Sequence, residues 1–291
     1  MKIDGRQIAT LITDQLKIHV TRLKKNINPH LAVILVGDDL SSIAYINQKK
    51  RIAAEIGAQI TVYHLPATTQ TGELRKLTFN LNLDLLVHGV IIQRPVPLDI
   101  SKDQLDSMVT PDKDVDGFHP QTQFTPPIAA AVLKILEWGS YDVCNNPESP
   151  LKQNFCETFP SWLQKQKILV IGRGETAGKP IAYTLTKMGV AFEVAHSKTT
   201  NLEELCLVAN IIISCVGKRN ILRHSMVSNK TILIGVGLHT ENGKLKTDYD
   251  QEEIASKVAY YTPVPGGVGP VNVACLFENL LEGIQKQNNP S

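Results

Sequence analysis

The sequence predicts an α/β protein of two domains, built on parallel sheets that helices cover on both faces. Short apolar runs alternate with amphipathic helical segments along most of the chain, which is the pattern of buried parallel strands. The 291 residues are 43% hydrophobic and 20% charged, enough for about two cores. A glycine-rich turn near residue 172 follows one apolar run, as at the start of a Rossmann-like domain.

The first half of the chain alternates between helical and strand patterns. The run Leu31–Gly37 is continuously apolar and of strand length, and apolar residues at helical spacing flank it. Asp38 and Asp39 offer N-cap side chains for the second helix, and Gly57 ends it. In chain order we expect a helix over 6–25, a strand over 31–37, a helix over 41–56, a strand over 59–63, a helix over 71–82, a strand over 85–92 and a helix over 128–137.

Two polar loops follow these elements. One is Gln93-Arg94-Pro95-Val96-Pro97, directly after the strand that ends at Ile92, and the other is Pro111-Asp112-Lys113-Asp114-Val115-Asp116-Gly117-Phe118. In open α/β sheets such loops lie at the carboxyl ends of the strands, where ligands bind. The sequence therefore predicts a ligand site at these loops.

The α/β pattern breaks over residues 139–160, where Gly, Asn, Pro and two cysteines interrupt it. A structureless segment of this length inside a compact domain is uncommon, so we interpret it as an irregular linker or insertion. The expected division is a first domain over 1–138, the linker over 139–160 and a second domain over 161–271. A C-terminal helix over 272–291 is expected to pack back on the first domain, with a deep cleft between the domains.

The second domain opens with a strand, a glycine turn and a helix. The turn reads Gly172-Arg173-Gly174-Glu175-Thr176-Ala177-Gly178, and this spacing directs backbone N–H groups and a helix N-terminus toward the phosphates of a dinucleotide. Alone the motif is a weak signal. Further strands over 191–195, 210–215 and 231–236 give it the context of a mononucleotide-binding half.

The choice of dinucleotide depends on the end of the second strand of this domain. Glu193 is at about the distance where an acid binds the ribose of NAD, but the alternation of the strand makes it a mid-strand residue. The strand end is then His196-Ser197-Lys198-Thr199, whose cation and hydroxyls suit a 2′-phosphate, and Arg173 could reach the same place. NADP is favoured over NAD.

The segment from Pro263 to Pro270 contains three prolines and three glycines in eight residues. Such a composition cannot continue a helix or a central strand, so it predicts a shaped loop whose glycines let a ligand approach the backbone. The alternative is a simple connection between a strand that ends near Tyr261 and a helix over 272–285.

Composition excludes several classes of function. The net charge of +2 gives no case for a nucleic-acid or membrane partner, and no apolar run is long enough for a membrane span. The first residues lack the apolar core of a signal peptide, so we expect a cytoplasmic protein. Five cysteines without a CxxC pair, and histidines without metal-site spacing, predict neither a disulfide framework nor a metal.

Seven motifs in register resemble the methylenetetrahydrofolate dehydrogenase/cyclohydrolase family over nearly the whole chain. They are Val36-Gly37-Asp38-Asp39, Ser42-x-x-Tyr45-x-x-x-Lys49, Gln93 to Pro97, Pro111 to Gly117, Gly172-Arg173, His196-Ser197-x-Thr199 and Pro263 to Pro270. The resemblance implies NADP-dependent oxidation of 5,10-methylenetetrahydrofolate to methenyltetrahydrofolate, and hydrolysis of that product to 10-formyltetrahydrofolate. It also implies a homodimer.

The resemblance assigns roles to residues of the first domain. It implies that Lys49 is the central catalytic group, that Gln93 orients it, that Tyr45 stacks on the folate ring and that Asp116 holds the pterin. Ser42 would fix the helix start or the lysine. Tyr45 and Lys49 are four residues apart and share one helix face, although a partly buried Tyr beside a solvated Lys is the ordinary state of such pairs. Asp116 before a glycine could equally be a turn residue.

The remaining site residues follow from the same resemblance and from the glycine turn. Substrate contacts are expected at Tyr45, Ser42, Asp116, Pro263, Gly266 and Gly267. Cofactor contacts are expected at Gly172, Arg173, Gly174, Gly178, His196, Ser197, Thr199, Val216 and Gly237.

The chain departs from the family pattern mainly on the cofactor side. Gly174 stands where a serine is usual, and Gly235-Val236-Gly237-Leu238-His239 stands for the usual Asp-Val-Gly-Ile-Asn. These departures keep three alternatives open: a cyclohydrolase with weak or lost dehydrogenase activity, a non-catalytic NADP-binding protein, and an unrelated NAD-linked dehydrogenase that uses Glu193.

Overall fold

The computed structural model describes residues 1–23, 27–145 and 158–288. The chain divides into two compact units: unit 1 contains Met1–Ala9 and Ile128–Asn272, and unit 2 contains Thr10–Pro127 and Val273–Ser291. The domain boundaries and the cleft expected from the sequence stay predictions. Among the helices of the described ranges, none combines the length and the apolar character that a membrane span requires.

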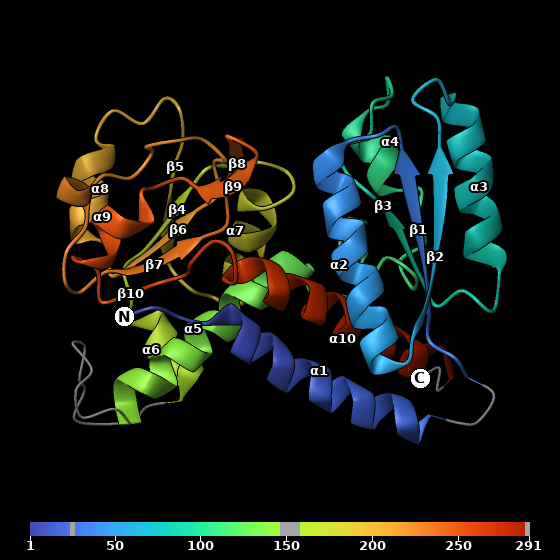
Figure 1. Cartoon of the computed structure of the whole chain (residues 1–291), viewed down its shortest axis with the longest axis horizontal. Coiled ribbons are helices and arrows are strands. Elements are labelled where there is room, and N and C mark those ends of the chain that lie inside the picture. Colours follow the sequence, from blue (N-terminus) through green and yellow to red (C-terminus); the bar gives the residue numbers. More distant parts are fainter. Residues whose placement is uncertain (24–26, 146–157, 289–291) are drawn as a thin grey trace. The chain divides into compact units, whose positions relative to one another are not determined.

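Unit 2 is built on a parallel three-stranded sheet (Figure 1) in the order β2-β1-β3. The central strand is buried at every residue but its first, which explains why its sequence is continuously apolar. The strands and their helices are β1 (His30–Val36), α2 (Leu40–Ile56), β2 (Gln59–Leu65), α3 (Thr71–Leu83), β3 (Gly89–Ile92) and α4 (Lys102–Asp106).

Helices α2 and α3 cover opposite faces of this sheet. The chain passes from β1 to β2 and then back across β1 to β3, so right-handed connections place the two helices on opposite sides. Alternate residues of β1 pack in one cluster with Leu74 and Leu81 of α3, a cluster that contains no described residue of α2. The other face of β1 is therefore available to α2.

Both ends of α2 are fixed by the residues that the sequence predicts. Asp39 is the N-cap and its Oδ1 accepts a hydrogen bond from Ser42 N at 2.7 Å. Gly57 is the C-cap with a φ of 80°, in the left-handed region that glycine adopts without strain. The predicted start and end of this helix are confirmed.

The strand expected over 85–92 begins only at Gly89, so this prediction is wrong for its first four residues. Asp84 Oδ1 accepts a hydrogen bond from Leu86 N at 2.9 Å, which closes a local turn. Leu85 and Leu86 are 89% and 75% exposed in this turn. The hydrogen bond to the Asp84 side chain therefore places the first residues of this apolar run in a turn, and the strand begins after it.

Unit 1 is built on a parallel five-stranded sheet in the order β10-β7-β6-β4-β5 (Figure 1). The chain goes from β4 to β5 on one side and then to β6 on the other, so the topological switch point lies between β4 and β6. The strands are β4 (Ile168–Ile171), β5 (Phe192–Ala195), β6 (Ile211–Ser214), β7 (Ile232–Gly235) and β10 (Tyr260–Tyr261). The predicted strands and the α/β class are confirmed.

A hairpin that we did not predict follows β7. Strands β8 (Leu238–Glu241) and β9 (Lys244–Thr247) pair antiparallel, and Asn242 and Gly243 between them both have positive φ. Asn-Gly is the preferred pair for such a two-residue turn, so the signal was present in the sequence. Unit 1 also contains the shorter helices α6 (Phe159–Gln164), α7 (Gly178–Lys187), α8 (Leu202–Val208), η1 (His224–Met226) and α9 (Gln251–Ala255).

Three long helices differ from their expected bounds. α1 spans Gly5–Arg22, and α5 spans Pro127–Asn145, so the first part of the expected irregular segment 139–160 is helical. Residues 146–157 of that segment lie outside the described residues. α10 spans Val268–Asn288 and thus includes Pro270, which the sequence assigned to a loop. Proline is tolerated there because the first-turn N–H groups of a helix have no intrahelical partner.

Candidate active site

A buried lysine lies at the carboxyl edge of the unit 2 sheet. Lys49 on α2 is 7% exposed, and its Nζ donates a hydrogen bond to Oε1 of Gln93 at 2.7 Å. Gln93 directly follows β3, and its own backbone N donates to Ile34 O of β1. The structure thus brings together two residues that the sequence proposes as catalytic.

The amide of Gln93 has a defined orientation. Its Nε2 donates to Arg94 O at 3.1 Å, which leaves Oε1 as the atom that faces the lysine. Ser42, which is 1% exposed, donates from Oγ to the same carbonyl at 3.3 Å. Ser42 therefore ties the start of α2 to the loop after β3.

Lys49 and Asp116 influence each other electrostatically. Burial lowers the pKa of the Lys49 amine from its ordinary 10.5, and the charge of Asp116 opposes this shift. Burial also raises the pKa of Asp116 from its ordinary 3.8, while Lys49 and then Arg94 oppose that shift. An amine whose pKa moves toward neutrality can both accept and return a proton, which is the requirement for general acid–base chemistry.

Tyr45 lies one helical turn before Lys49 on the same face of α2. Its side chain is partly exposed, and burial of the hydroxyl raises the pKa of the phenol above its ordinary 10.0. The residue therefore presents a neutral hydroxyl and an aromatic ring beside the lysine.

Arg94 has a place at the site that sequence reasoning missed. Its guanidinium lies over the ring of Phe118, 4.0 Å from the centroid, and pairs with the buried carboxylate of Asp106. Lys102 contacts the same carboxylate. The sequence did show an arginine in the loop directly after a buried strand. It did not show the partners of this arginine, because Asp106 and Phe118 come from other segments of the chain.

Asp114 is a second residue that sequence reasoning left without a role. It is 3% exposed, and its Oδ2 accepts a hydrogen bond from His119 N at 2.7 Å. Its backbone oxygen accepts from Gly117 N at 3.1 Å. Asp114 therefore shapes the turn that carries Asp116, and burial raises the pKa of its carboxyl to about 7.

In unit 1 the glycine turn lies at the switch point of the sheet. Gly172 has a φ of 101°, and a Cβ there would lie 2.9 Å from Cys215 O, so the loops after β4 and β6 are in contact. Gly178 opens α7 where a Cβ would lie 2.1 Å from Gly172 O. Gly174 faces open space, with no atom within 4 Å of a Cβ built there. The turn has the compact shape that lets phosphates approach a helix N-terminus.

Val216 and Gly237 lie in adjoining loops after β6 and β7. A Cβ on Gly237 would lie 2.7 Å from Val216 N and 2.4 Å from Asp248 Oδ2. Asp248 organises this place, because its carboxylate accepts from Val216 N, Lys218 N and Ser214 Oγ at 2.6–2.9 Å. Gly237 is thus the residue that this packing allows.

The end of β5 forms a tight turn over residues 196–199. Thr199 N donates to His196 O at 2.8 Å, and His196 N donates to Thr199 Oγ1 at 3.0 Å. Ser197 and Arg173 are both exposed. Glu193 lies within β5, opposite Leu169 of β4, as the alternation predicted. The turn over 196–199, whose side chains suit a 2′-phosphate, therefore lies at the end of β5, whereas Glu193 lies within the strand.

The loop that carries Pro263, Gly266 and Gly267 follows β10. Gly266 has a φ of 100°, and a Cβ on Gly267 would lie 2.4 Å from Pro263 O. A Cβ on Gly5 would lie 1.9 Å from Gly267 O, so the N-terminal segment closes one side of the loop. The loop is compact and shaped, as the sequence predicted.

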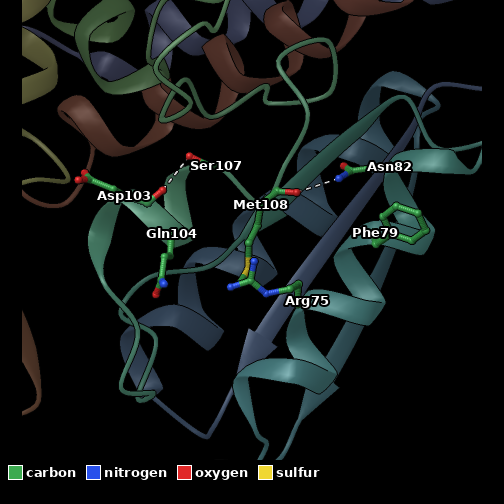
Figure 2. A pocket seen from close by; sticks show the side chains of 7 residues that line it. All are labelled: Arg75, Phe79, Asn82, Asp103, Gln104, Ser107 and Met108. Atoms are coloured by element: carbon green, nitrogen blue, oxygen red, sulfur yellow. Dashed lines mark hydrogen bonds between the residues drawn. The ribbon is translucent and has the colours of Figure 1, made fainter.

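A pocket of about 520 Å³ lies elsewhere on unit 2, between α3 and α4 (Figure 2). Asn82 forms part of its wall and donates from Nδ2 to Met108 O at 2.8 Å. The lining residues are Arg75, Phe79, Asn82, Asp103, Gln104, Ser107 and Met108. They include none of the site residues that the sequence predicts.

The fold and these two sites define the class of protein: an α/β enzyme with a Rossmann-like unit and a buried lysine at the edge of a second parallel sheet. Residues 3–116 match the model of the tetrahydrofolate dehydrogenase/cyclohydrolase catalytic domain. Residues 154–288 match the model of the NAD(P)-binding domain of the same family. The chain belongs to the tetrahydrofolate dehydrogenase/cyclohydrolase family.

Relatives and solved structures agree with this assignment. The chain is 34% identical over 296 residues to the bifunctional protein FolD of Acetivibrio thermocellus, covering 98% of this chain and 97% of the relative. The crystal structure of the bifunctional FolD enzyme from Campylobacter jejuni matches with a TM-score of 0.86 and 34% identity, over 99% of each chain. The FolD enzyme of Trypanosoma brucei, solved with NADP and an inhibitor, matches with a TM-score of 0.85 and 26% identity. The match covers 99% of this chain and 98% of that enzyme.

Proposed function

We propose that the protein is a bifunctional folate enzyme that uses NADP to oxidise 5,10-methylenetetrahydrofolate and then hydrolyses the methenyl product to 10-formyltetrahydrofolate. Family membership supports both activities. The observation that carries the proposal is the buried Lys49, paired with Gln93 and electrostatically coupled to Asp116.

The oxidation requires mainly positioning. The bridging carbon of the substrate lies between two nitrogens, so loss of hydride leaves a cation that both nitrogens stabilise. NADP supplies the hydride acceptor. Tyr45 stacks on the folate ring and Asp116 accepts hydrogen bonds from the pterin, which together fix the bridging carbon. Pro263, Gly266 and Gly267 contact the same substrate through the backbone.

The hydrolysis requires proton transfer, and Lys49 carries it. The oxygen of a water forms a bond to the methenyl carbon, and the bond from that carbon to N5 breaks. Of the two water protons, one ends on N5 and one is released. Lys49 accepts the proton from the attacking water, because burial favours its neutral amine. Gln93 holds the amine in place by accepting its hydrogen bond.

The residues of unit 1 fit NADP. The glycine turn of Gly172, Gly174 and Gly178 brings a backbone loop to the N-terminus of α7, where a pyrophosphate is stabilised. We assign Arg173, His196, Ser197 and Thr199 to the 2′-phosphate and the loops at Val216 and Gly237 to the nicotinamide half. The open space at Gly174 favours close approach of the cofactor.

We further propose an assembly, which the family resemblance implies, and a location. The protein acts as a homodimer, and it acts in the cytoplasm. Its partners are folate substrates, and the proposed reactions involve neither nucleic acid nor a membrane. Neither step needs a metal.

The test follows the absorbance of NADPH and of methenyltetrahydrofolate after methylenetetrahydrofolate and NADP are mixed with the protein. Wild type is expected to form NADPH without accumulating the methenyl compound. Lys49→Met is expected to lower the rate of hydrolysis by at least about 100-fold, which is the scale of general acid–base catalysis. Any NADPH that this variant forms should then be accompanied by methenyltetrahydrofolate. Lys50→Met is the matched control, since Lys50 is the exposed neighbour on another face.

Other outcomes separate the alternatives. Hydrolysis of supplied methenyltetrahydrofolate without NADPH formation would indicate a cyclohydrolase whose dehydrogenase activity is lost. Binding of NADP without turnover of either folate would indicate a non-catalytic protein and contradict the proposal.

A further inference from the structure

The loop from Thr262 to Gly267 is held by a glutamine side chain. Gln251 Nε2 donates to Val264 O at 2.8 Å, and Gln251 Oε1 accepts from Val264 N at 2.7 Å. The side chain therefore satisfies both peptide groups of one loop residue, as a neighbouring strand would. Gln251 is the first residue of α9, so this contact ties the loop to a helix of the same unit.

A tyrosine holds the residue at which the loop begins. Tyr249 is 4% exposed, and its hydroxyl donates to Thr262 O at 2.8 Å. Thr262 Oγ1 in turn accepts from Gly235 N at 2.7 Å, and Thr262 N donates to Leu233 O at 3.1 Å. Burial raises the pKa of the phenol, so the hydroxyl remains a donor at neutral pH.

Gly235 provides the space that Tyr249 occupies. A Cβ at position 235 would lie 2.6 Å from the Tyr249 hydroxyl oxygen and 3.1 Å from its Cε1 and Cζ atoms. The glycine that departs from the family pattern is thus packed against the tyrosine that holds the loop. This departure has a structural reason that does not involve the cofactor.

We propose that Tyr249 and Gln251 are positioning residues that hold the Pro263–Gly267 loop in its substrate-binding conformation before folate arrives, and that Gly235 is required because Tyr249 fills its side-chain space. The inference rests on the proposed function, in which this loop contacts the folate. Gln251 already uses the N–H and C=O groups of Val264, so the substrate contacts fall to the other loop residues, Pro263, Gly266 and Gly267. Holding the loop in advance removes the entropic cost of ordering it on binding.

The first experiment compares Gln251→Leu with wild type in steady-state kinetics. We expect the KM for methylenetetrahydrofolate to rise about tenfold, with little change in kcat or in the KM for NADP, because two hydrogen bonds that order the loop are lost. Gln251→Glu keeps the acceptor for Val264 N and loses the donor, so its KM is expected to be intermediate. Glu252→Gln, at the exposed neighbouring position, is the control that should match wild type.

Amide hydrogen exchange tests the contact independently of activity. The Val264 amide is expected to exchange about tenfold faster in Gln251→Leu than in wild type, since its acceptor is lost. Faster exchange with an unchanged folate KM would overturn the proposal, because the loop would then be held without serving the substrate. A protein that turns over no folate at all would refute the proposed function, whereas unchanged exchange would refute the contact itself.

A double-mutant cycle tests the role of Gly235. Gly235→Ala is expected to raise the folate KM about tenfold or more in the wild-type background, because the new Cβ displaces the Tyr249 hydroxyl. In the Tyr249→Phe background the same change is expected to add less than about twofold, since the closest atom is gone. Equal effects in the two backgrounds would contradict the coupling, and a rise in the KM for NADP alone would place Gly235 in the cofactor site instead.

Discussion

Asp114 and Asp116 are two residues apart, yet their environments differ. Asp116 is partly exposed and faces the charges of Lys49 and Arg94. Asp114 is buried, its carboxyl accepts from His119 N, and the charge of Asp116 further raises its pKa. One loop thus presents a carboxylate to the site and keeps a second carboxyl, with a pKa of about 7, underneath it.

The buried carboxyl predicts a pH dependence of stability. Folded Asp114 keeps its proton up to about pH 7, whereas the unfolded chain loses it near 3.8. The folded state therefore binds more protons between these values, and the free energy of unfolding falls as pH rises through this window. Asp114→Asn keeps an acceptor for His119 N and removes the titration. Its loss of stability between pH 5 and pH 8 should be smaller than that of wild type, by on the order of 2 kcal/mol.

Urea denaturation at the two pH values measures this difference. Asp112→Asn is the control, because Asp112 is exposed in the same loop and should follow wild type. Parallel losses of stability in wild type and Asp114→Asn would show that Asp114 does not titrate in this range.

At the residue scale, the sequence was informative where spacing and burial coincide. Tyr45 and Lys49 could be placed on one face because a helix repeats every 3.6 residues. Gln93 could be placed in a loop at a carboxyl strand end because it directly follows the strand that ends at Ile92. Asp114 and Arg94 received no role because their environments depend on residues that only the tertiary fold brings near. Burial of a charged side chain is not encoded in its local pattern.

At the scale of elements, two glycines in unit 2 predict opposite effects of the same substitution. Gly57 has a φ of 80°, and the nearest atom to a Cβ there is 3.8 Å away, so backbone strain alone determines the cost. Gly57→Ala should lower the free energy of unfolding by about 1 kcal/mol. Gly72 lies in the first turn of α3 with no atom within 4 Å of a Cβ, so Gly72→Ala should raise it by about 0.5 kcal/mol.

Urea midpoints of the two variants check this pair. Because both substitutions add one methyl group to unit 2, the sign of the effect isolates the backbone conformation. A stabilising Gly57→Ala would mean that α2 does not end in the left-handed conformation.

Elements were predictable where a cap or a long apolar run fixes them. Asp39 and Gly57 marked both ends of α2, and four strands of the unit 1 sheet followed from their apolar runs. The errors arose from local chemistry that competes with the pattern. The Asp84 side chain closes a turn in an apolar run, and Pro270 is accommodated in the first turn of α10.

At the scale of the whole molecule, the α/β class and the family were both recoverable from the sequence, because motifs in register cover nearly the whole chain. The N-terminal segment shows why the domain division is harder. Met1–Ala9 belongs to unit 1, where Ile3 N donates to Tyr261 O, although α1 continues into residues of unit 2. Such long-range pairing has no local signal.

Cofactor choice can be read from the thermal stability of the whole protein. A ligand at about 100 times its Kd stabilises the folded state by ~2.7 kcal/mol, which raises Tm by several degrees. Because Arg173 and the turn at 196–199 suit a 2′-phosphate, NADP should raise Tm more than NAD at equal concentration. Arg173→Ala should remove most of that difference and leave the shift with NAD unchanged, since NAD has no phosphate for the guanidinium to bind. Lys187→Ala, at the far end of α7, is the control that should retain the wild-type difference. A larger shift with NAD than with NADP in wild type would instead favour the NAD-linked alternative, in which Glu193 binds the ribose.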